Sequence, residues 1–173
     1  MTGQINVNKI AARTGNTITV ETGDVFHQPG SIIQAVQLHT PGSVGTVSSP
    51  ILTTTSTSFV DFLTKAITTK LANSLIYVQT YSLYYTNSAA YGDGRLLRDS
   101  TTIDECKYMY YTAGAYEFLP LRFQVLDSPS AAAGTTITYK HQMKYNSGGA
   151  LNCGYGDSGG KVNANMILME IAP

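Results

Sequence analysis

The chain has no tryptophan, only two cysteines and six prolines in 173 residues, and few charged side chains. Charged residues make up 13% of the sequence, about half of the roughly 25% found in ordinary soluble domains. Eleven basic and eleven acidic residues cancel to a net charge of zero. A protein that follows a phosphate backbone needs a basic excess or a basic stripe, so we expect no nucleic-acid partner.

Long apolar runs are also missing. The longest, such as "MILM" at residues 166–169, are far shorter than the roughly 20 residues that span a bilayer. The opening "MTGQINVNKI" lacks the apolar core of a signal peptide, so we expect a protein made in a cytoplasm and not inserted into a membrane. There Cys106 and Cys153 are expected to be free thiols, although their redox state stays open.

The sequence is instead rich in alternation with a period of two residues. In "TITYKHQMKY" the apolar and aromatic side chains, His141 among them, fall on one face and Thr, Lys and Gln fall on the other, which predicts a strand with one wet face. "SLIYVQTYSLYY" at residues 74–85 is apolar on both faces in its first half, which is typical of a central strand. Further strands are predicted at residues 32–38, 58–62, 95–98, 107–111, 121–127 and 166–171.

Turn sequences separate these strands: "TPGSVG", "YGDG", "DSPSAAAG", "NSGG" and "GDSGG". Many short strands joined by such turns predict an all-β fold, an antiparallel β-sandwich or jelly roll. One segment is ambiguous. "FVDFLTKAITTKLA" spaces its apolar residues close to a helical period, so residues 63–73 are either strand or a short helix.

The first thirty residues differ from the rest. Thr14-Gly15-Asn16 recurs eight positions later as Thr22-Gly23-Asp24, and each triplet predicts a tight turn between very short strands. Such a thin ribbon cannot bury much by itself, so it should rest on the main domain, on sister chains or on another protein. We therefore predict an N-terminal ribbon at 1–30, ending at Pro29-Gly30, and a β-sandwich domain at 31–173.

The string Gly156-Asp157-Ser158-Gly159-Gly160 resembles the loop that presents the nucleophilic serine of chymotrypsin-like enzymes. A serine nucleophile also needs a histidine, an orienting carboxylate and an oxyanion hole. None of the three histidines lies in the Ala-Ala-His-Cys setting that accompanies this loop in those enzymes, and only 13 residues follow the string. We interpret it as a glycine-rich turn and expect no catalytic residue.

Candidate metal ligands are equally sparse. His27, His39 and His141 are widely spaced, and neither cysteine has a Cys-x-x-Cys partner. His141 is predicted to be a core residue. The acidic residues Asp93, Asp99, Asp104 and Glu105 lack the spacing of a dedicated calcium loop. We expect no metal and no cofactor.

Tyrosine is the unusual feature, since nine of the twelve fall between Tyr77 and Tyr116. Tyrosine joins a large apolar body to a hydroxyl that needs a wet or hydrogen-bonded neighbour, so it favours interfaces and binding loops. The alternative is that alternate tyrosines fill the core of two central strands. We assign Tyr77 and Tyr81 to the core. The candidate binding residues are Tyr84, Tyr85, Tyr91, Tyr110 and Tyr111.

Over nearly its full length the chain resembles small β-rich virion proteins of tailed bacteriophages, of the marine and cyanophage tail-fibre or capsid-decoration type. The matching pieces run in order as "ARTGNTITVETGDVFHQPGSIIQ", "TSTSFVDF", "GRLLRDS", "FQVLDSPSAAAGTTITYKHQMKYNSGG" and "MILMEIAP". The chain departs from them at "LTKAITTKLANS", where those proteins carry a turn with proline. The resemblance implies a structural module, commonly a homotrimer, with a thin N-terminal ribbon before a compact β-domain.

Together these features predict a non-enzymatic structural protein of a virion. It would be a trimeric fibre or capsid decoration attached through its ribbon, with other capsid or tail proteins as partners. The alternative is a knob that binds a receptor or a host glycan through tyrosine-rich loops. The attachment point, head or tail, stays open.

Overall fold

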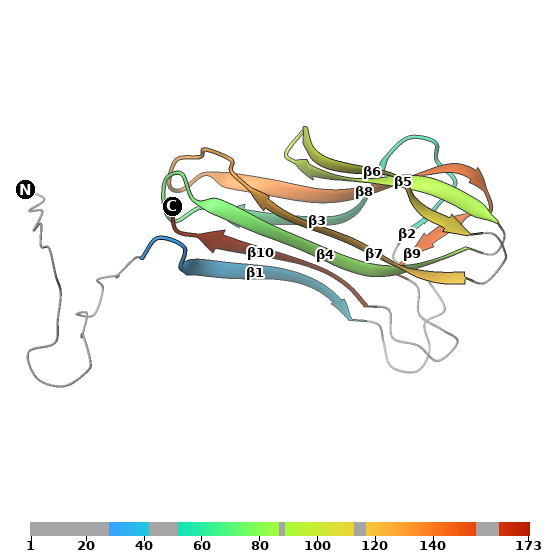
Figure 1. Cartoon of the computed structure of the whole chain (residues 1–173), viewed down its shortest axis with the longest axis horizontal. Coiled ribbons are helices and arrows are strands. Elements are labelled where there is room, and N and C mark those ends of the chain that lie inside the picture. The colour runs from blue at the N-terminus through green and yellow to red at the C-terminus, as the bar shows by residue number, and fades with distance from the viewer. Residues whose placement is uncertain (1–27, 42–51, 87–88, 113–116, 155–162) are drawn as a thin grey trace, which may run out of the picture.

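The computed structural model describes residues 28–41, 52–86, 89–112, 117–154 and 163–173, and the fold is that of two facing β-sheets (Figure 1). Every regular element in these ranges is a strand and every pairing is antiparallel, which confirms the all-β prediction. The strands are β1 (Ile32–Pro41), β2 (Leu52–Thr54), β3 (Val60–Thr68), β4 (Leu75–Thr86), β5 (Ala90–Arg98), β6 (Thr101–Thr112), β7 (Glu117–Asp127), β8 (Thr136–Gly148), β9 (Leu151–Cys153) and β10 (Asn163–Ile171).

Sheet A contains β1, β10, β4 and β7 in that spatial order, extended at one end by the short strands β9 and β2. β10 pairs with the first half of β4 and β9 with its last three residues, while β7 runs along the opposite side of β4. β4 is therefore central, as its two-sided apolar sequence predicted. β1 and β7 form the two long edges of the sheet.

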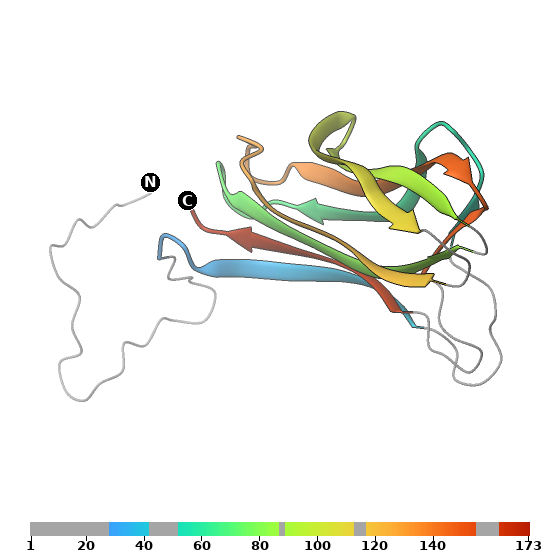
Figure 2. The same ribbon diagram turned by 45° about the vertical axis from the view of Figure 1, so that its right-hand side comes forward.

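Sheet B contains β3, β8, β5 and β6 in that order. In both views it lies over sheet A (Figures 1 and 2). The chain changes sheet repeatedly, so each sheet is assembled from strands far apart in sequence. The pairing with the largest sequence separation joins β1 to β10, the last strand. The turn at Pro29-Gly30 immediately precedes β1, where Gly30 donates its N–H to the Ala172 carbonyl at 3.0 Å. The ribbon predicted for 1–30 lies, up to residue 27, outside the described residues.

The core lies between the sheets. Its largest fully buried side chains come from both layers and include Leu63, Ile76, Leu96, Tyr139 and Leu168. Hydrogen bonds also connect the two sheets. The Asp127 carboxylate of β7 accepts hydrogen bonds from Arg98 of β5 at 2.8 Å and from the Tyr139 hydroxyl of β8 at 2.6 Å. Burial and the neighbouring Asp127 charge both raise the pKa of Tyr139.

The ambiguous segment is a strand and then a turn, not a helix. β3 pairs with β8 through Thr68, and the pairing register shifts between Asp61 and Leu63. This bulge lets two consecutive residues, Phe62 and Leu63, both be buried, with Ile67 next on the inner face. The extra residue moves the alternation by one position, which explains the near-helical spacing in the sequence.

The sequence "YGDG" at residues 91–94 is not a turn, contrary to the prediction. It lies inside β5, with a register shift between Gly92 and Gly94. A Cβ atom at Gly94 would lie 2.2 Å from the Met109 sulfur of β6. The Met109 and Met143 side chains pack over the Gly94 backbone, so a larger residue there would have to displace them.

The outer faces of the two sheets differ in chemistry. Sheet B presents an ordered polar network: the Asp61 carboxylate accepts from Lys140 at 2.8 Å and from the Gln142 amide, and Gln142 in turn accepts from Arg95 at 2.7 Å. The Arg95 guanidinium also lies 4.0 Å from the centre of the Phe59 ring. The described outer face of sheet A carries apolar and amide side chains instead.

Candidate functional site

Three tyrosines of β4, Tyr77, Tyr81 and Tyr84, face in the opposite directions from those predicted. Alternation does place Tyr84 on the other face from Tyr77 and Tyr81, but Tyr84 is fully buried in the core, whereas Tyr77 and Tyr81 are half-buried on the outer face of sheet A. The assignment of Tyr84 to a binding loop is therefore wrong, as is the assignment of Tyr77 and Tyr81 to the core. The alternation fixes which residues share a face, but only the packing of the second sheet decides which face is inside.

The other candidate tyrosines are less fully described. Tyr85 lies on β4, and Tyr110 and Tyr111 lie on β6, but their side chains are outside the described part of the structure. Tyr91 on β5 is half-buried, and its ring lies 5.4 Å, centre to centre, from the ring of Tyr108 on β6. Of the five predicted residues, Tyr91 is the one whose described side chain reaches the surface.

Tyr108, which the sequence did not single out, is the most exposed large aromatic residue described, at 65%. Its φ of 52° is in the left-handed region, which a bulky residue adopts only under strain. The residue lies in the stretch where the β5–β6 register shifts, next to Gly92 and Gly94. A signal was available in those two glycines inside a strand, since they indicate a bulge or a close backbone approach.

A buried carboxylate holds this bulge in place. Asp93 is only 4% exposed and accepts hydrogen bonds from the Tyr108 N–H and the Asn146 amide, both at 2.9 Å, and Lys144 lies 2.9 Å from its second oxygen. Burial alone would raise the pKa of Asp93, but these donors outweigh it and hold the pKa below its usual value. Asp93 is therefore a charged anchor that fixes Tyr108 in its exposed position.

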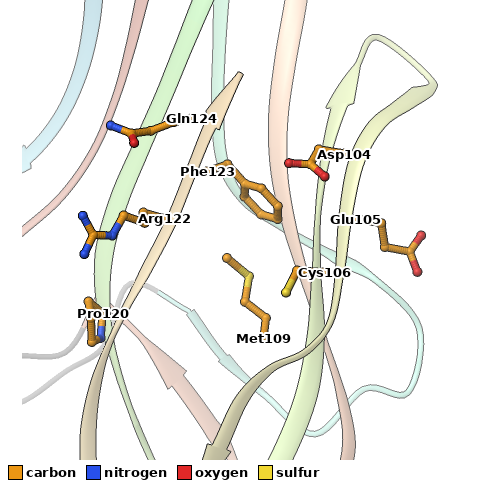
Figure 3. Close-up of a pocket in the computed structure, with 8 residues that line it drawn as sticks. All are labelled: Asp104, Glu105, Cys106, Met109, Pro120, Arg122, Phe123 and Gln124. Atoms are coloured by element: carbon orange, nitrogen blue, oxygen red, sulfur yellow. The ribbon is translucent and has the colours of Figure 1, made fainter. Parts of the chain in front are cut away.

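A groove of about 460 Å³ opens between β6 and β7, the edge strands that flank one side of the sandwich (Figure 3). The buried ring of Phe123 and the side chain of Met109 extend into it, and Asp104 and Cys106 lie on its β6 side, whereas the Arg122 guanidinium points away to the outer face of β7 (Figure 3). The groove therefore has an apolar floor with the Asp104 carboxylate beside it (Figure 3).

The groove contains one of the two free thiols of the chain. Cys106 is an exposed free thiol, and a thiol nucleophile needs a neighbouring base or cation to form its thiolate. The remaining described lining residues are Asp104, Glu105, Met109, Pro120, Arg122, Phe123 and Gln124. The Arg122 guanidinium points away from Cys106 (Figure 3), and the described lining contains no histidine. Cys153 is free but buried in the core, where burial raises the pKa of its thiol.

His141 is a core residue, as predicted. Its ring lies edge-on to Phe62 of β3 and Phe123 of β7, at 5.4 and 5.0 Å between ring centres, and its Nε2 is 3.2 Å from the Met143 sulfur. Burial lowers the pKa of His141 to about 3, so the ring is neutral near pH 7. Its Nδ1 has no hydrogen-bond partner among the described residues, a structural cost of placing imidazole between two phenyl rings.

A second buried carboxylate, Glu170, closes the end of sheet A. It accepts from the Lys70 and Leu71 N–H groups, the Ser74 hydroxyl and the Gln34 amide at distances of 2.6–2.9 Å. Burial would raise the pKa of Glu170, but these donors lower it overall. The carboxylate binds the turn between β3 and β4 to the last strand, which is a structural use of charge.

The remaining sequence candidates do not converge. The Ser158 string and His27 lie outside the described residues, and His39 is exposed near the end of β1. Asp99 caps the N–H of Thr138 at 2.9 Å. No group of three or more potential metal ligands occurs within the described ranges, and no helix there is long and apolar enough to cross a membrane.

No family model matches the chain, and no curated protein matches it in sequence. Solved structures similar to it include the infectious bursal disease virus VP2 subviral particle (TM-score 0.49, 11% identity, covering 92% of this chain and 38% of that one). Others are the T13 particle of the same virus (0.47, 10%, 90% and 39%) and dimeric latent PorU from Porphyromonas gingivalis (0.48, 10%, 91% and 14%). The chain thus spans well under half of each. At these scores the likenesses carry no conclusion about function.

Proposed function

We propose that this chain is a structural protein of a virus particle, displayed on its surface as a jelly-roll domain. The observation that carries the proposal is the strand order. Setting aside the short β2 and β9, sheet A runs β1-β10-β4-β7 and sheet B runs β3-β8-β5-β6, all antiparallel. A chain that alternates between two four-stranded sheets in this way fits two Greek keys, the jelly roll common in capsid and lectin domains.

The more specific form of the proposal follows the sequence resemblance. The chain would be a tailed-phage component, a short fibre or a capsid decoration, that assembles as a homotrimer and attaches through residues 1–30. It would act by binding and need no cofactor. The use of the buried charges supports this role, because Asp93, Asp127 and Glu170 are all bound by internal donors.

Particle fractionation tests the proposal directly. Particles are purified on a density gradient and probed with an antibody against the full chain, by immunoblot and by immunogold microscopy. We expect the chain to sediment with the particles in a fixed ratio to the major capsid protein, with gold on the outer surface. A chain found only in the soluble fraction of the lysate would contradict the proposal.

A second candidate function rests on the exposed pair Tyr91 and Tyr108. Two neighbouring aromatic rings on a fixed bulge provide a surface on which a sugar ring can stack, as in a receptor-binding knob. A glycan array with the wild-type chain and Tyr108→Ala tests this candidate. Binding that is lost in Tyr108→Ala and kept in Tyr77→Ala, a tyrosine on the other sheet, supports it. An array without signal removes it.

A further inference from the structure

The outer face of sheet A carries apolar side chains on all four long strands and little charge. The described side chains that alternate with the buried ones on β4, β10, β7 and β1 point away from the core. These outward residues are Ala35, Gln37, His39, Leu75, Tyr77, Gln79, Tyr81, Leu83, Pro120, Arg122, Gln124, Leu126, Asn165, Ile167, Met169 and Ile171. We call this set face A. Arg122, on the edge strand β7, is its one residue with a permanent charge among those described.

The strand register places like residues in rows across face A. Ala35, Met169, Tyr77 and Leu126 are directly paired from β1 through β10 and β4 to β7. The next row is Gln37, Ile167, Gln79 and Gln124. Leu126 is 57% exposed, and Ile32, which pairs with Ile171 at one end of the sheet, is 60% exposed. An apolar row with an amide-rich row beside it resembles the centre of a protein interface more than a wet surface.

Sheet B provides the internal comparison. Its outer face has the same architecture but carries the ion pairs Lys140–Asp61 and Lys144–Asp93 and the bond from Arg95 to Gln142. The apolar character of face A is therefore not a general property of this low-charge chain. It is confined to one sheet.

We propose that face A is the surface through which copies of this chain associate with one another. Four strands about 4.8 Å apart, over about nine residues of 3.3 Å each, give face A a footprint of roughly 600 Å². Together with its side-chain relief, this approaches the roughly 800 Å² that each partner buries in a stable complex.

A second copy is the occupant that the chemistry of face A favours. Like charges that meet across an interface cost several kcal/mol, so a face that carries many charges rejects its own copy. The described part of face A has one permanent charge, placed at an edge, and amides such as Gln79 both donate and accept. The face is thus compatible with itself. Around a threefold axis, each copy of face A would contact the same face of its two neighbours.

This inference deepens the proposed function, because the homotrimer proposed there needs a surface of this kind. The test uses the full chain and two double variants that add the same charge to the two sheets. Ala35→Arg with Gln79→Arg places two positive charges on face A. Ala66→Arg with Thr64→Arg places two on the outer face of sheet B, where both residues are exposed on edge strand β3.

Mass is measured by light scattering during gel filtration and by sedimentation at micromolar concentration. We expect wild type and the sheet B variant to have three times the 18.6 kDa of one chain, and the face A variant to be a monomer. Far-UV circular dichroism must show the same β signal in all three proteins. A monomeric wild type, or a face A variant that stays associated, overturns the inference.

A cysteine pair keeps the test decisive if the face A variant does not fold. In a Cys106→Ser background, which removes the exposed thiol, Gln79→Cys lies near the centre of face A and Thr64→Cys lies on sheet B. A flexible bis-maleimide, which does not need the two Cα atoms to lie within the roughly 7 Å that a disulfide requires, should cross-link the first protein into covalent dimers and leave the second unlinked. Equal cross-linking of both proteins, or none at Gln79→Cys, contradicts the inference.

The outcomes also separate the interface from the proposed function. A wild-type protein that is a dimer, and that becomes a monomer in the face A variant, supports the interface and contradicts the trimer. A wild-type monomer that is still found on particles contradicts the interface and leaves the virion role standing.

Discussion

Sheet A points its described carboxylates inward, whereas sheet B carries ion-paired carboxylates on its outer side. In sheet A, Glu170 and Asp127 are enclosed by donors from the turn after β3 and from sheet B. In sheet B, Asp61 is exposed and pairs with Lys140 across the surface. An inward carboxylate fixes the chain at one place, while outward ion pairs keep a sheet face hydrated. The two sheets thus use their described carboxylates in different ways.

The largest effect should come from removing an inward carboxylate of sheet A. Glu170→Ala leaves the N–H groups of Lys70 and Leu71, the Ser74 hydroxyl and the Gln34 amide without their acceptor. Leaving several buried donors unsatisfied lowers the free energy of unfolding by about 3 kcal/mol or more. Urea denaturation followed by circular dichroism measures it.

Glu105→Ala is the matched control for that variant, because Glu105 is an exposed glutamate of sheet B. Its free energy of unfolding should change by less than about 0.5 kcal/mol. Since the folded-state pKa of Glu170 is lowered, its contribution is present above the ordinary pKa of 4.5 and is lost as the pH falls further. Equal decreases in the free energy of unfolding for Glu170→Ala and Glu105→Ala would contradict the difference between the two sheets.

His141, a buried histidine of sheet B, should make the protein sensitive to mild acid. Its pKa is about 3 in the folded chain and 6.5 ordinarily, so the unfolded chain binds the proton first as the pH falls. The free energy of unfolding should therefore decrease by about 2 kcal/mol between pH 6.5 and 4.5. In His141→Leu that decrease should disappear.

The measurement is a series of urea denaturation curves from pH 7 to pH 4.5. The slope against pH is the result, because His141→Leu also changes packing with Phe62 and Phe123 and so shifts stability at every pH. The carboxylates with lowered pKa values contribute mainly below this window. A slope that persists unchanged in His141→Leu would show that another group titrates.

The smallest effect should come from the exposed ion pair of sheet B. The pKa of Asp61 is lowered by the hydrogen bond from Gln142 and then by Lys140, but its side chain is 43% exposed. Asp61→Ala should therefore lower the free energy of unfolding by about 0.5 kcal/mol in low salt. At 1 M NaCl the loss should be smaller still, because the pair is screened. A decrease in the free energy of unfolding above about 2 kcal/mol would show that this ion pair stabilises the fold as strongly as a buried one does.

Alternation predicted most of the fold, because the side-chain period of a strand is a local property. The segments at 74–85, 121–127 and 136–145 all lie within long strands, and His141 is inside as expected. The errors arose where two strands lose their common register. The bulge in β3 gives its apolar residues a spacing close to that of a helix. The glycines at the register shift in β5 led to the prediction of a turn at "YGDG".

The candidate site was less predictable. Tyr91 reaches the surface, but Tyr84 does not, and Tyr108 was missed. Tyr108 is exposed because Asp93, fifteen residues away, holds the bulge open through the Tyr108 N–H. The glycines on either side of Asp93 indicate a bulge in the sequence, but they do not indicate which side chain of β6 the bulge exposes.

By itself, the sequence determined that the chain forms antiparallel strands with alternating faces, carries little charge and concentrates its tyrosines in two long strands. These follow from composition and from the two-residue period of a strand. Only the tertiary structure decided which face of β4 is inside, because Tyr77 and Tyr84 satisfy the period equally well in either orientation. Sheet B covers the face that carries Ile76, Val78 and Tyr84, and this leaves Tyr77 and Tyr81 on the apolar outer surface.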